Sequence, residues 1–137
     1  MKKLFLLLSN IVILFLVNNM DAQVFGSSHS LFWEGTDIEG VSKAKFVKFN
    51  STETIKYYQK KNESFVLKYS VDIEKGTFEI EIKSLKKGKI YQKKITNSYS
   101  DKIEFNSSKS DKLIITLKGI STTGKFSLRY GKKDEIN

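Results

Sequence analysis

Two stretches of this sequence alternate between apolar and polar residues, and this alternation constrains the fold more than any other feature. In SFVLKYSVDI every odd position from Phe65 to Ile73 is apolar, and in TFEIEIKS the apolar positions are even. A period of two is typical of a β-strand that buries one face. The glycine of the intervening EKGT favours a hairpin turn. The predicted hairpin pairs are Ile73–Phe78, Val71–Ile80 and Tyr69–Ile82.

The same alternation returns near the C-terminus in LIITLKGISTTGKFSLRY, residues 113–130. Its apolar positions change from odd to even across the segment GISTTG, which is rich in turn residues. We interpret this segment as the turn of a second hairpin. The alternative is a ligand-binding loop, but the segment carries no charged or aromatic side chain. The predicted pairs are Leu113–Tyr130, Ile115–Leu128 and Leu117–Phe126.

Shorter alternating runs predict further strands at residues 30–34, 41–49, 54–60, 89–96 and 101–105. About seven to eight strands separated by short turns are typical of an antiparallel β-sandwich, either jelly-roll or Ig-like. We therefore expect an all-β fold in which the hairpin faces form the core. The residues predicted to be buried are Tyr69, Val71, Ile80, Ile82, Ile115, Leu117, Phe126 and Leu128.

Residues 1–22 have the pattern of a secretory signal peptide. Two lysines precede an apolar run from Leu4 to Val17, and Ala22 is the small residue that signal peptidase requires. The run is shorter than the ~20 residues that span a membrane. We expect cleavage between Ala22 and Gln23, which leaves residues 23–137 as a single secreted or periplasmic domain.

The composition narrows the chemistry. The absence of cysteine excludes disulfides, thiol catalysis and cysteine-bound metals. The chain has 24 lysines and arginines against 15 acidic residues, a formal net charge of +9. Arg129 is its one arginine. A surface dominated by lysine attracts polyanions diffusely rather than through bidentate contacts.

Two lysine-rich segments, residues 43–61 and 83–94, contain tyrosines among their cations. Aromatic rings can stack on sugars while lysines meet anionic groups, so these segments are candidates for binding acidic polysaccharide, an anionic cell surface or another protein. Export argues against a nucleic-acid partner. The alternative is that the lysines only solubilise the surface and protect strand edges. The candidate binding residues are Lys86, Lys87, Lys89, Lys93, Lys94, Tyr57, Tyr58 and Tyr91.

Catalysis is the alternative function, because Glu79 and Glu81 share one face of a predicted strand. Two carboxylates on one face can act as the acid and base of a glycosidase, so a small secreted carboxylate-dependent hydrolase is the second hypothesis. That role requires a deep cleft, which a small sandwich rarely provides. We expect the solvated strand face, and hence a non-enzymatic binding module of the bacterial envelope or exterior.

Metal and cofactor chemistry has little support in the sequence. Glu34, Asp37 and Glu39 are clustered, but calcium requires six or more oxygen ligands. His29 is the lone histidine, whereas zinc sites use three or four ligands, and no nucleophile motif accompanies it. We expect no cofactor, no metal and no catalytic residue.

Strand and turn residues also carry a resemblance. They are Gly76, Thr77, Ile80 and Ile82, followed by Leu113, Ile115, Leu117, Gly119, Gly124, Phe126, Leu128 and Tyr130. In this pattern the chain resembles small exported β-sandwich proteins of bacteria. The resemblance implies the fold and the export, and it implies no catalytic residue.

Overall fold

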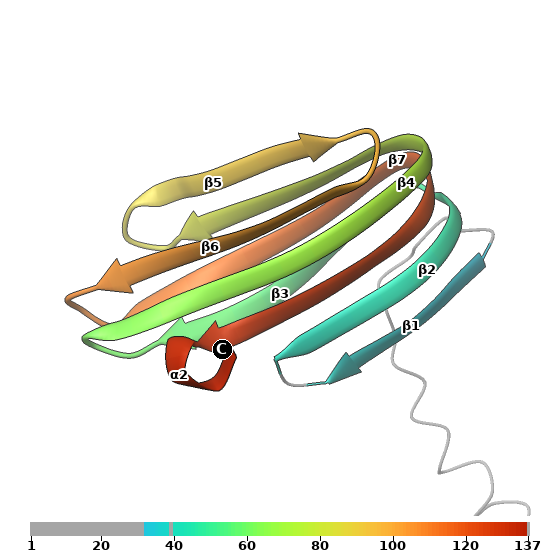
Figure 1. Ribbon diagram of the computed structural model, residues 1–137. Coiled ribbons are helices and arrows are strands. Elements are labelled where there is room, and N and C mark those ends of the chain that lie inside the picture. The colour runs from blue at the N-terminus through green and yellow to red at the C-terminus, as the bar shows by residue number, and fades with distance from the viewer. Residues whose placement is uncertain (1–31, 39, 137) are drawn as a thin grey trace, which may run out of the picture.

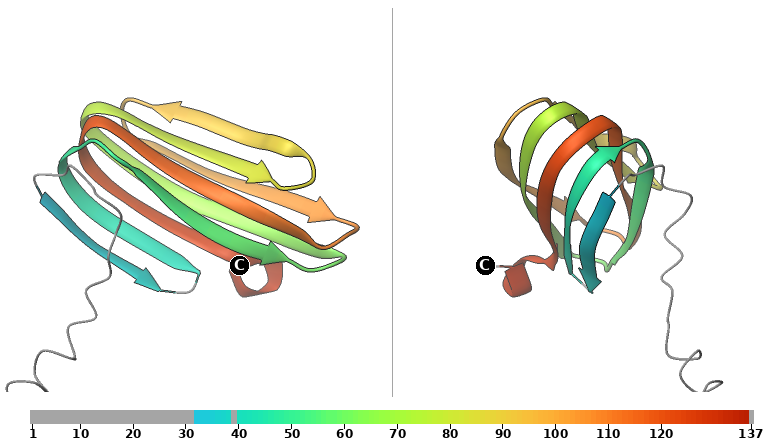
Figure 2. Two further views of the ribbon diagram at one scale, coloured as in Figure 1. Left: turned by 180° about the vertical axis from the view of Figure 1, so that it is seen from behind. Right: turned by 90° about the vertical axis from the view of Figure 1, so that its right-hand side faces the viewer.

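The computed structural model describes residues 32–38 and 40–136, with side chains from residue 40 onward. Seven strands form one antiparallel sheet, which is folded over into two packed layers (Figures 1 and 2). The expected antiparallel β-sandwich is confirmed. The elements are β1 (Phe32–Ile38), β2 (Val41–Phe49), β3 (Thr52–Gln59), β4 (Glu63–Ser84), β5 (Gly88–Ile95), β6 (Tyr99–Ser107), β7 (Asp111–Lys132) and α2 (Lys133–Ile136).

Strands β4 and β7 are each 22 residues long, run through both layers and pair with each other in both. We call one layer A; its order is β1, β2, residues 124–132 of β7, residues 63–73 of β4, and β6. Layer B has the order β3, residues 111–120 of β7, residues 77–84 of β4, and β5. The two layers are therefore joined by two continuous strands at one end, which we call the closed end (Figure 1).

Both predicted hairpins are wrong. Neither EKGT nor GISTTG reverses the chain within a sheet; each is a bend at which a long strand passes from one layer to the other. The ladder shifts irregularly between Ile73 and Thr77, and this shift changes the inward positions from odd to even. A hairpin produces the same change by reversing the chain. The observed partners are Tyr69–Leu128, Val71–Phe126, Ile80–Leu117 and Ile82–Ile115.

The two bends lie against each other, and Gly76 marks their closest approach. Its φ of 79° lies in the left-handed region, and a Cβ at this position would lie 2.3 Å from the carbonyl oxygen of Ser121. Thr122 is fully buried beside it. The Thr122 hydroxyl donates to the carbonyl of Thr77 and accepts the amide hydrogen of Ile120 at 2.9 Å. Hydrogen bonds and close packing thus fix the closed end.

The predicted core is confirmed, because all eight residues expected inside are buried. Four aromatic rings fill the space next to the bends. The Phe46 and Phe78 rings stack with centroids 5.8 Å apart, and Phe126 lies 5.5 Å from Phe78. Phe49 completes the group, 5.3 Å from Phe46. Since Phe46 and Phe126 belong to layer A and Phe78 to layer B, this cluster packs the two layers together.

The shorter strands follow the predicted segments closely. Residues 41–49, 54–60, 89–96 and 101–105 correspond to β2, β3, β5 and β6, and residues 30–34 overlap the start of β1. Helix α2 was not predicted. The signal peptide, its cleavage site and His29 lie outside the described residues, as do the side chains of Glu34, Asp37 and Glu39.

Candidate functional site

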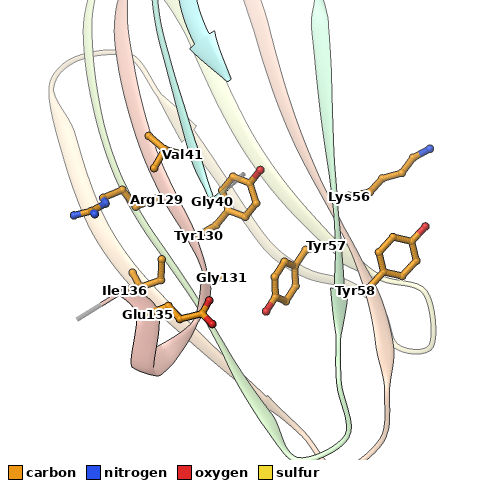
Figure 3. Close-up of a pocket in the computed structure, with 10 residues that line it drawn as sticks. All are labelled: Gly40, Val41, Lys56, Tyr57, Tyr58, Arg129, Tyr130, Gly131, Glu135 and Ile136. Carbon is orange, nitrogen blue, oxygen red and sulfur yellow. The ribbon is translucent and has the colours of Figure 1, made fainter. Parts of the chain in front are cut away.

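A groove opens between the layers at the end opposite the bends, which we call the open end (Figure 3). Its volume is about 560 Å³. Strand β3 forms one wall, the end of β7 forms the other, and helix α2 and the start of β2 complete it. The lining residues are Gly40, Val41, Lys56, Tyr57, Tyr58, Arg129, Tyr130, Gly131, Glu135 and Ile136.

Packing and a hydrogen bond both hold Tyr57 in the groove. It lies at an inward position of β3, half-buried, with its ring 4.8 Å from that of Phe65. Its hydroxyl donates to Oε1 of Glu63 at 2.5 Å. Burial, this hydrogen bond and the charges of Glu63 and Glu135 raise the pKa of Tyr57 well above its usual value of ~10. The phenol is therefore neutral at any physiological pH.

Tyr130 lies near the C-terminal end of β7 and faces Tyr57 across the groove (Figure 3). Its ring is half-buried, and its backbone amide donates to the carbonyl of Gly40 at 2.9 Å. This hydrogen bond holds the β1–β2 turn against the end of β7. The two tyrosines thus present aromatic surface from different layers to the same space.

Helix α2 closes one side of the groove, and three contacts hold it there. Ile136 is buried, and its carbonyl accepts a hydrogen bond from Nζ of Lys68 at 2.9 Å. Nζ of Lys133 lies 2.9 Å from Oε1 of Glu104. The helix thereby places Glu135 at the groove, where its carboxylate supplies a hydrogen-bond acceptor.

The two cations of the groove stand on its rims. Lys56 and Tyr58 project from the far side of β3, and Arg129 projects from the far side of β7 (Figure 3). The interior is therefore aromatic and aliphatic with one carboxylate, and cations flank it on both sides. Such a combination of apolar walls and few polar groups is typical of a small-molecule or glycan site.

The structure separates the predicted binding residues into two places. Tyr57 and Tyr58 lie at the groove on β3, which is one edge of layer B. The other candidates lie on β5, the opposite edge of that layer, or in the turn before it. The backbone amides of Lys86 and Lys87 donate to Oγ of Ser84 at 3.2 and 2.9 Å. Two strands separate the two groups of candidates.

The β5 candidates do not share one face. Lys89 and Lys94 are exposed, and Lys89 contacts both Gln92 and Glu81. Lys93, in contrast, is half-buried, and its Nζ lies 4.3 Å from the centroid of the Tyr99 ring. The lysines of this strand therefore offer less continuous charge than their spacing suggested.

Tyr91 belongs to a partly buried tyrosine cluster at the edge of the sandwich, and it is not part of the lysine surface. Its hydroxyl lies 2.5 Å from that of Tyr69 and donates to Oδ2 of Asp101 at 3.4 Å. Burial raises the pKa of both tyrosines. This cluster joins β5 in layer B to β4 and β6 in layer A, so its contacts account for Tyr91 structurally.

The carboxylate pair of the hydrolase hypothesis lies on the open outer face of layer B. Glu81 contacts Nζ of Lys83 and of Lys89, each at 3.0 Å, and hydrogen bonds from these lysines lower its pKa. Glu79 accepts a hydrogen bond from Nε2 of Gln92 at 3.1 Å. A carboxyl with a lowered pKa is a poor general acid, and neither residue lines the groove.

Sequence reasoning missed Tyr130, Glu135 and Ile136 as groove residues. Tyr130 ends the alternating run and was expected only to pair in a hairpin. Within residues 40–136, no group of three or more histidines and acids is placed to hold a metal ion. Across the same described part of the chain, none of the helices has the length and apolarity to cross a membrane.

No protein-family model and no curated protein matches this chain. Among solved structures, the enzymatically active domain of bacteriophage CBA120 tailspike protein 4 is similar at 12% identity and a TM-score of 0.39, over 73% of this chain and 18% of that one. The carbohydrate-binding module TmCBM61, in complex with β-1,4-galactotriose, has 13% identity and a TM-score of 0.37, over 74% and 88%. BiXyn10A CBM1 has 15% identity and a TM-score of 0.35, over 73% and 78%. These likenesses are remote.

Proposed function

We propose that this protein is an exported, non-enzymatic module that binds glycans in the groove at the open end. The observation that carries the proposal is the pair of tyrosine rings, Tyr57 and Tyr130, on opposite walls of one groove. The apolar C–H face of a pyranose packs favourably on an aromatic ring. A groove with a ring on each wall therefore suits a sugar better than a flat surface does.

The polar groups of the groove fit the same ligand class. The Glu135 carboxylate can accept hydrogen bonds from sugar hydroxyls. Lys56 and Arg129 stand on the rims, where their long side chains suit an acidic substituent that extends beyond the groove. We therefore propose that acidic glycans bind more tightly than neutral ones of the same length.

A glycan array with protein that begins at Gln23 would test the proposal, and calorimetry on the best soluble hit would give its Kd. We expect Tyr130→Ala to weaken binding by at least 10-fold, because it removes one wall. Tyr99→Ala is the matched control, since Tyr99 is also half-buried but lies at the opposite edge of the sandwich. Thermal melts of both variants would verify folding.

Two outcomes would contradict the proposal. One is the absence of any glycan that binds at millimolar concentration. The other is a glycan that binds Tyr130→Ala and the native protein equally. Export is tested separately by the intact mass of protein recovered from the producing cell's exterior or periplasm, where a retained Met1 would exclude cleavage of residues 1–22.

A further inference from the structure

The outer face of layer B exposes two large apolar side chains in one row. Tyr58 is 68% exposed and Leu85 is 70% exposed, the highest values among the exposed large hydrophobics from residue 40 onward. Both flank Lys112: Tyr58 is its partner across the β3–β7 ladder, and the amide of Leu85 donates to its carbonyl at 2.9 Å. The Lys112 Nζ lies 5.3 Å from the centre of the Tyr58 ring.

The next row continues the same combination of apolar and cationic groups. Ile114, which is half-buried, pairs with Lys56 on one side and with Lys83 on the other. We call these two rows the Tyr58–Leu85 strip. Its members are Tyr58, Lys112, Leu85, Lys56, Ile114 and Lys83.

The charge around the strip is positive. Lys86 and Lys87 directly follow Leu85, and both are exposed. The acid nearest in sequence to Lys112 is Asp111, which is turned inward and buried. Its carboxylate accepts hydrogen bonds from Oγ of Ser84 at 2.5 Å and from the amide of Lys112 at 2.7 Å. Glu81, in the following row, offsets part of this charge through Lys83, and Asp111 offsets part of the charge of Lys86.

From the exposed apolar pair and the positive charge around it, we infer that the Tyr58–Leu85 strip docks on the anionic headgroups of a lipid bilayer. Tyrosine and leucine enter the headgroup region, where amphipathic rings and aliphatic groups are favoured, and the lysines lie against the lipid phosphates. A polysaccharide would satisfy the lysines, but it offers little to an exposed leucine. The apolar pair therefore selects a lipid surface over a soluble polyanion.

The outer face of layer A provides the internal comparison. It also carries cations, among them Lys43, Lys45 and Lys102, all of them exposed. The row that begins with Lys43 continues through three serines: Ser127 pairs with Lys43 and with Ser70, and Ser70 pairs with Ser100. The Ser100 hydroxyl donates to that of Ser70 at 3.0 Å. These serines add polar surface beside the cations, and they provide no apolar side chain that could enter a bilayer.

Co-sedimentation with vesicles tests the inference. We expect protein beginning at Gln23 to bind vesicles of phosphatidylglycerol and phosphatidylcholine, and not vesicles of phosphatidylcholine alone. Changing Lys56, Lys83 and Lys112 together to glutamine should weaken binding by at least 10-fold, since each lysine near such a surface contributes about 5-fold. The same change at Lys43, Lys45 and Lys102 should weaken it by less than 3-fold.

A second variant separates lipid docking from simple attraction to charge. Leu85→Ser combined with Tyr58→Ser keeps every charge and should weaken vesicle binding by about 5-fold, while retention on heparin is unchanged. Equal losses from the two lysine triples, or native binding by the serine variant, would overturn the inference. So would retention on heparin without vesicle binding. Failure of glycan binding in Tyr130→Ala leaves this result unaffected, because Tyr130 is not part of the strip.

Discussion

The two ends of the sandwich differ in how the layers are joined. At the closed end, β4 and β7 carry the chain between the layers, and the bends approach so closely that a Cβ on Gly76 would meet backbone. At the open end no strand connects the layers, and a groove of about 560 Å³ lies between Tyr57 and Tyr130. The chain passes between the layers there through short loops, residues 60–62 and 108–110, so paired strands join the layers at one end and loops join them at the other.

Stability and binding therefore depend on different residues of this fold. Fully buried side chains occur towards both ends: Phe46, Phe78 and Thr122 lie at the bends, and Phe65 and Leu113 lie towards the open end. The groove differs from both, because its walls carry the half-buried Tyr57 and Tyr130 and its rims carry exposed cations. Substitutions at the closed end should therefore lower the free energy of unfolding with little direct effect on binding, whereas those on the groove walls should do the reverse.

The largest effect is expected from Gly76→Ala. The new Cβ would lie 2.3 Å from the Ser121 carbonyl oxygen, in a left-handed backbone conformation. Strain and overpacking together should lower the free energy of unfolding by about 3–5 kcal/mol in a denaturant melt. Gly88→Ala is the control, because its φ of 77° is similar and nothing lies within 4 Å of the added atom. A comparable loss in both variants would show that close contact between the bends does not matter.

Leu117→Ala should come next. Leu117 is buried and pairs with Ile80 on the neighbouring strand. Emptying a packed aliphatic site typically costs ~2–5 kcal/mol, and chemical denaturation would measure it. Leu85→Ala, at an exposed position, should change the free energy of unfolding by less than about 0.5 kcal/mol. A loss below that value in Leu117→Ala would contradict the placement of this residue in the core.

Thr122→Val should cost about 1–3 kcal/mol while keeping the side-chain shape. It removes a hydroxyl that joins the two bends, leaving the Thr77 carbonyl and the Ile120 amide without that partner. Thr122→Ser retains the hydroxyl and should be less destabilising. If the valine variant is as stable as the native protein, the hydrogen bonds contribute nothing net to the closed end.

Tyr57→Phe should have the smallest effect, about 0.5–1.5 kcal/mol at pH 7, because it removes one hydrogen bond at the open end. The folded state raises the pKa of Tyr57, so its stabilising effect is present below pH ~10. Above that pH the Tyr57 hydroxyl ionises more readily in the unfolded chain than in the folded protein. This difference favours unfolding, so the stabilising effect is lost. The difference between native and variant melts should therefore shrink from pH 8 to pH 11. A constant difference would exclude this linkage.

Alternation alone was enough to predict which residues are buried, because a period of two determines which side chains share a face. It could not determine the register. A hairpin and a bent strand with an irregular ladder both move the apolar positions from odd to even, as happens between Ile73 and Phe78. Only pairing with a distant strand distinguishes them, and that pairing depends on contacts such as Gly76 with Ser121, which sequence patterns do not specify.

The candidate site was also predictable only in part. Tyr57 and Tyr58 were selected for their aromatic character beside lysines, and both lie at the groove. Tyr91 and Lys93 were grouped with them by composition, but the sheet order places β5 at the other edge of layer B. Glu135 reaches the groove only through helix α2, whose position depends on the tertiary contacts of Lys68 and Lys133.

The shared β4–β7 ladder also sets an order in which the chain can fold. Its partners nearest in sequence are Ser84 and Leu113 in layer B, and its most distant partners are Phe65 and Lys132 in layer A. Closing the shortest loop first costs the least chain entropy, so we expect pairing to begin in layer B, proceed through the bends and finish in layer A. Neither layer is then an independent unit: a fragment cut at the bends would lose the strands that define both, and the sandwich should unfold in one cooperative step.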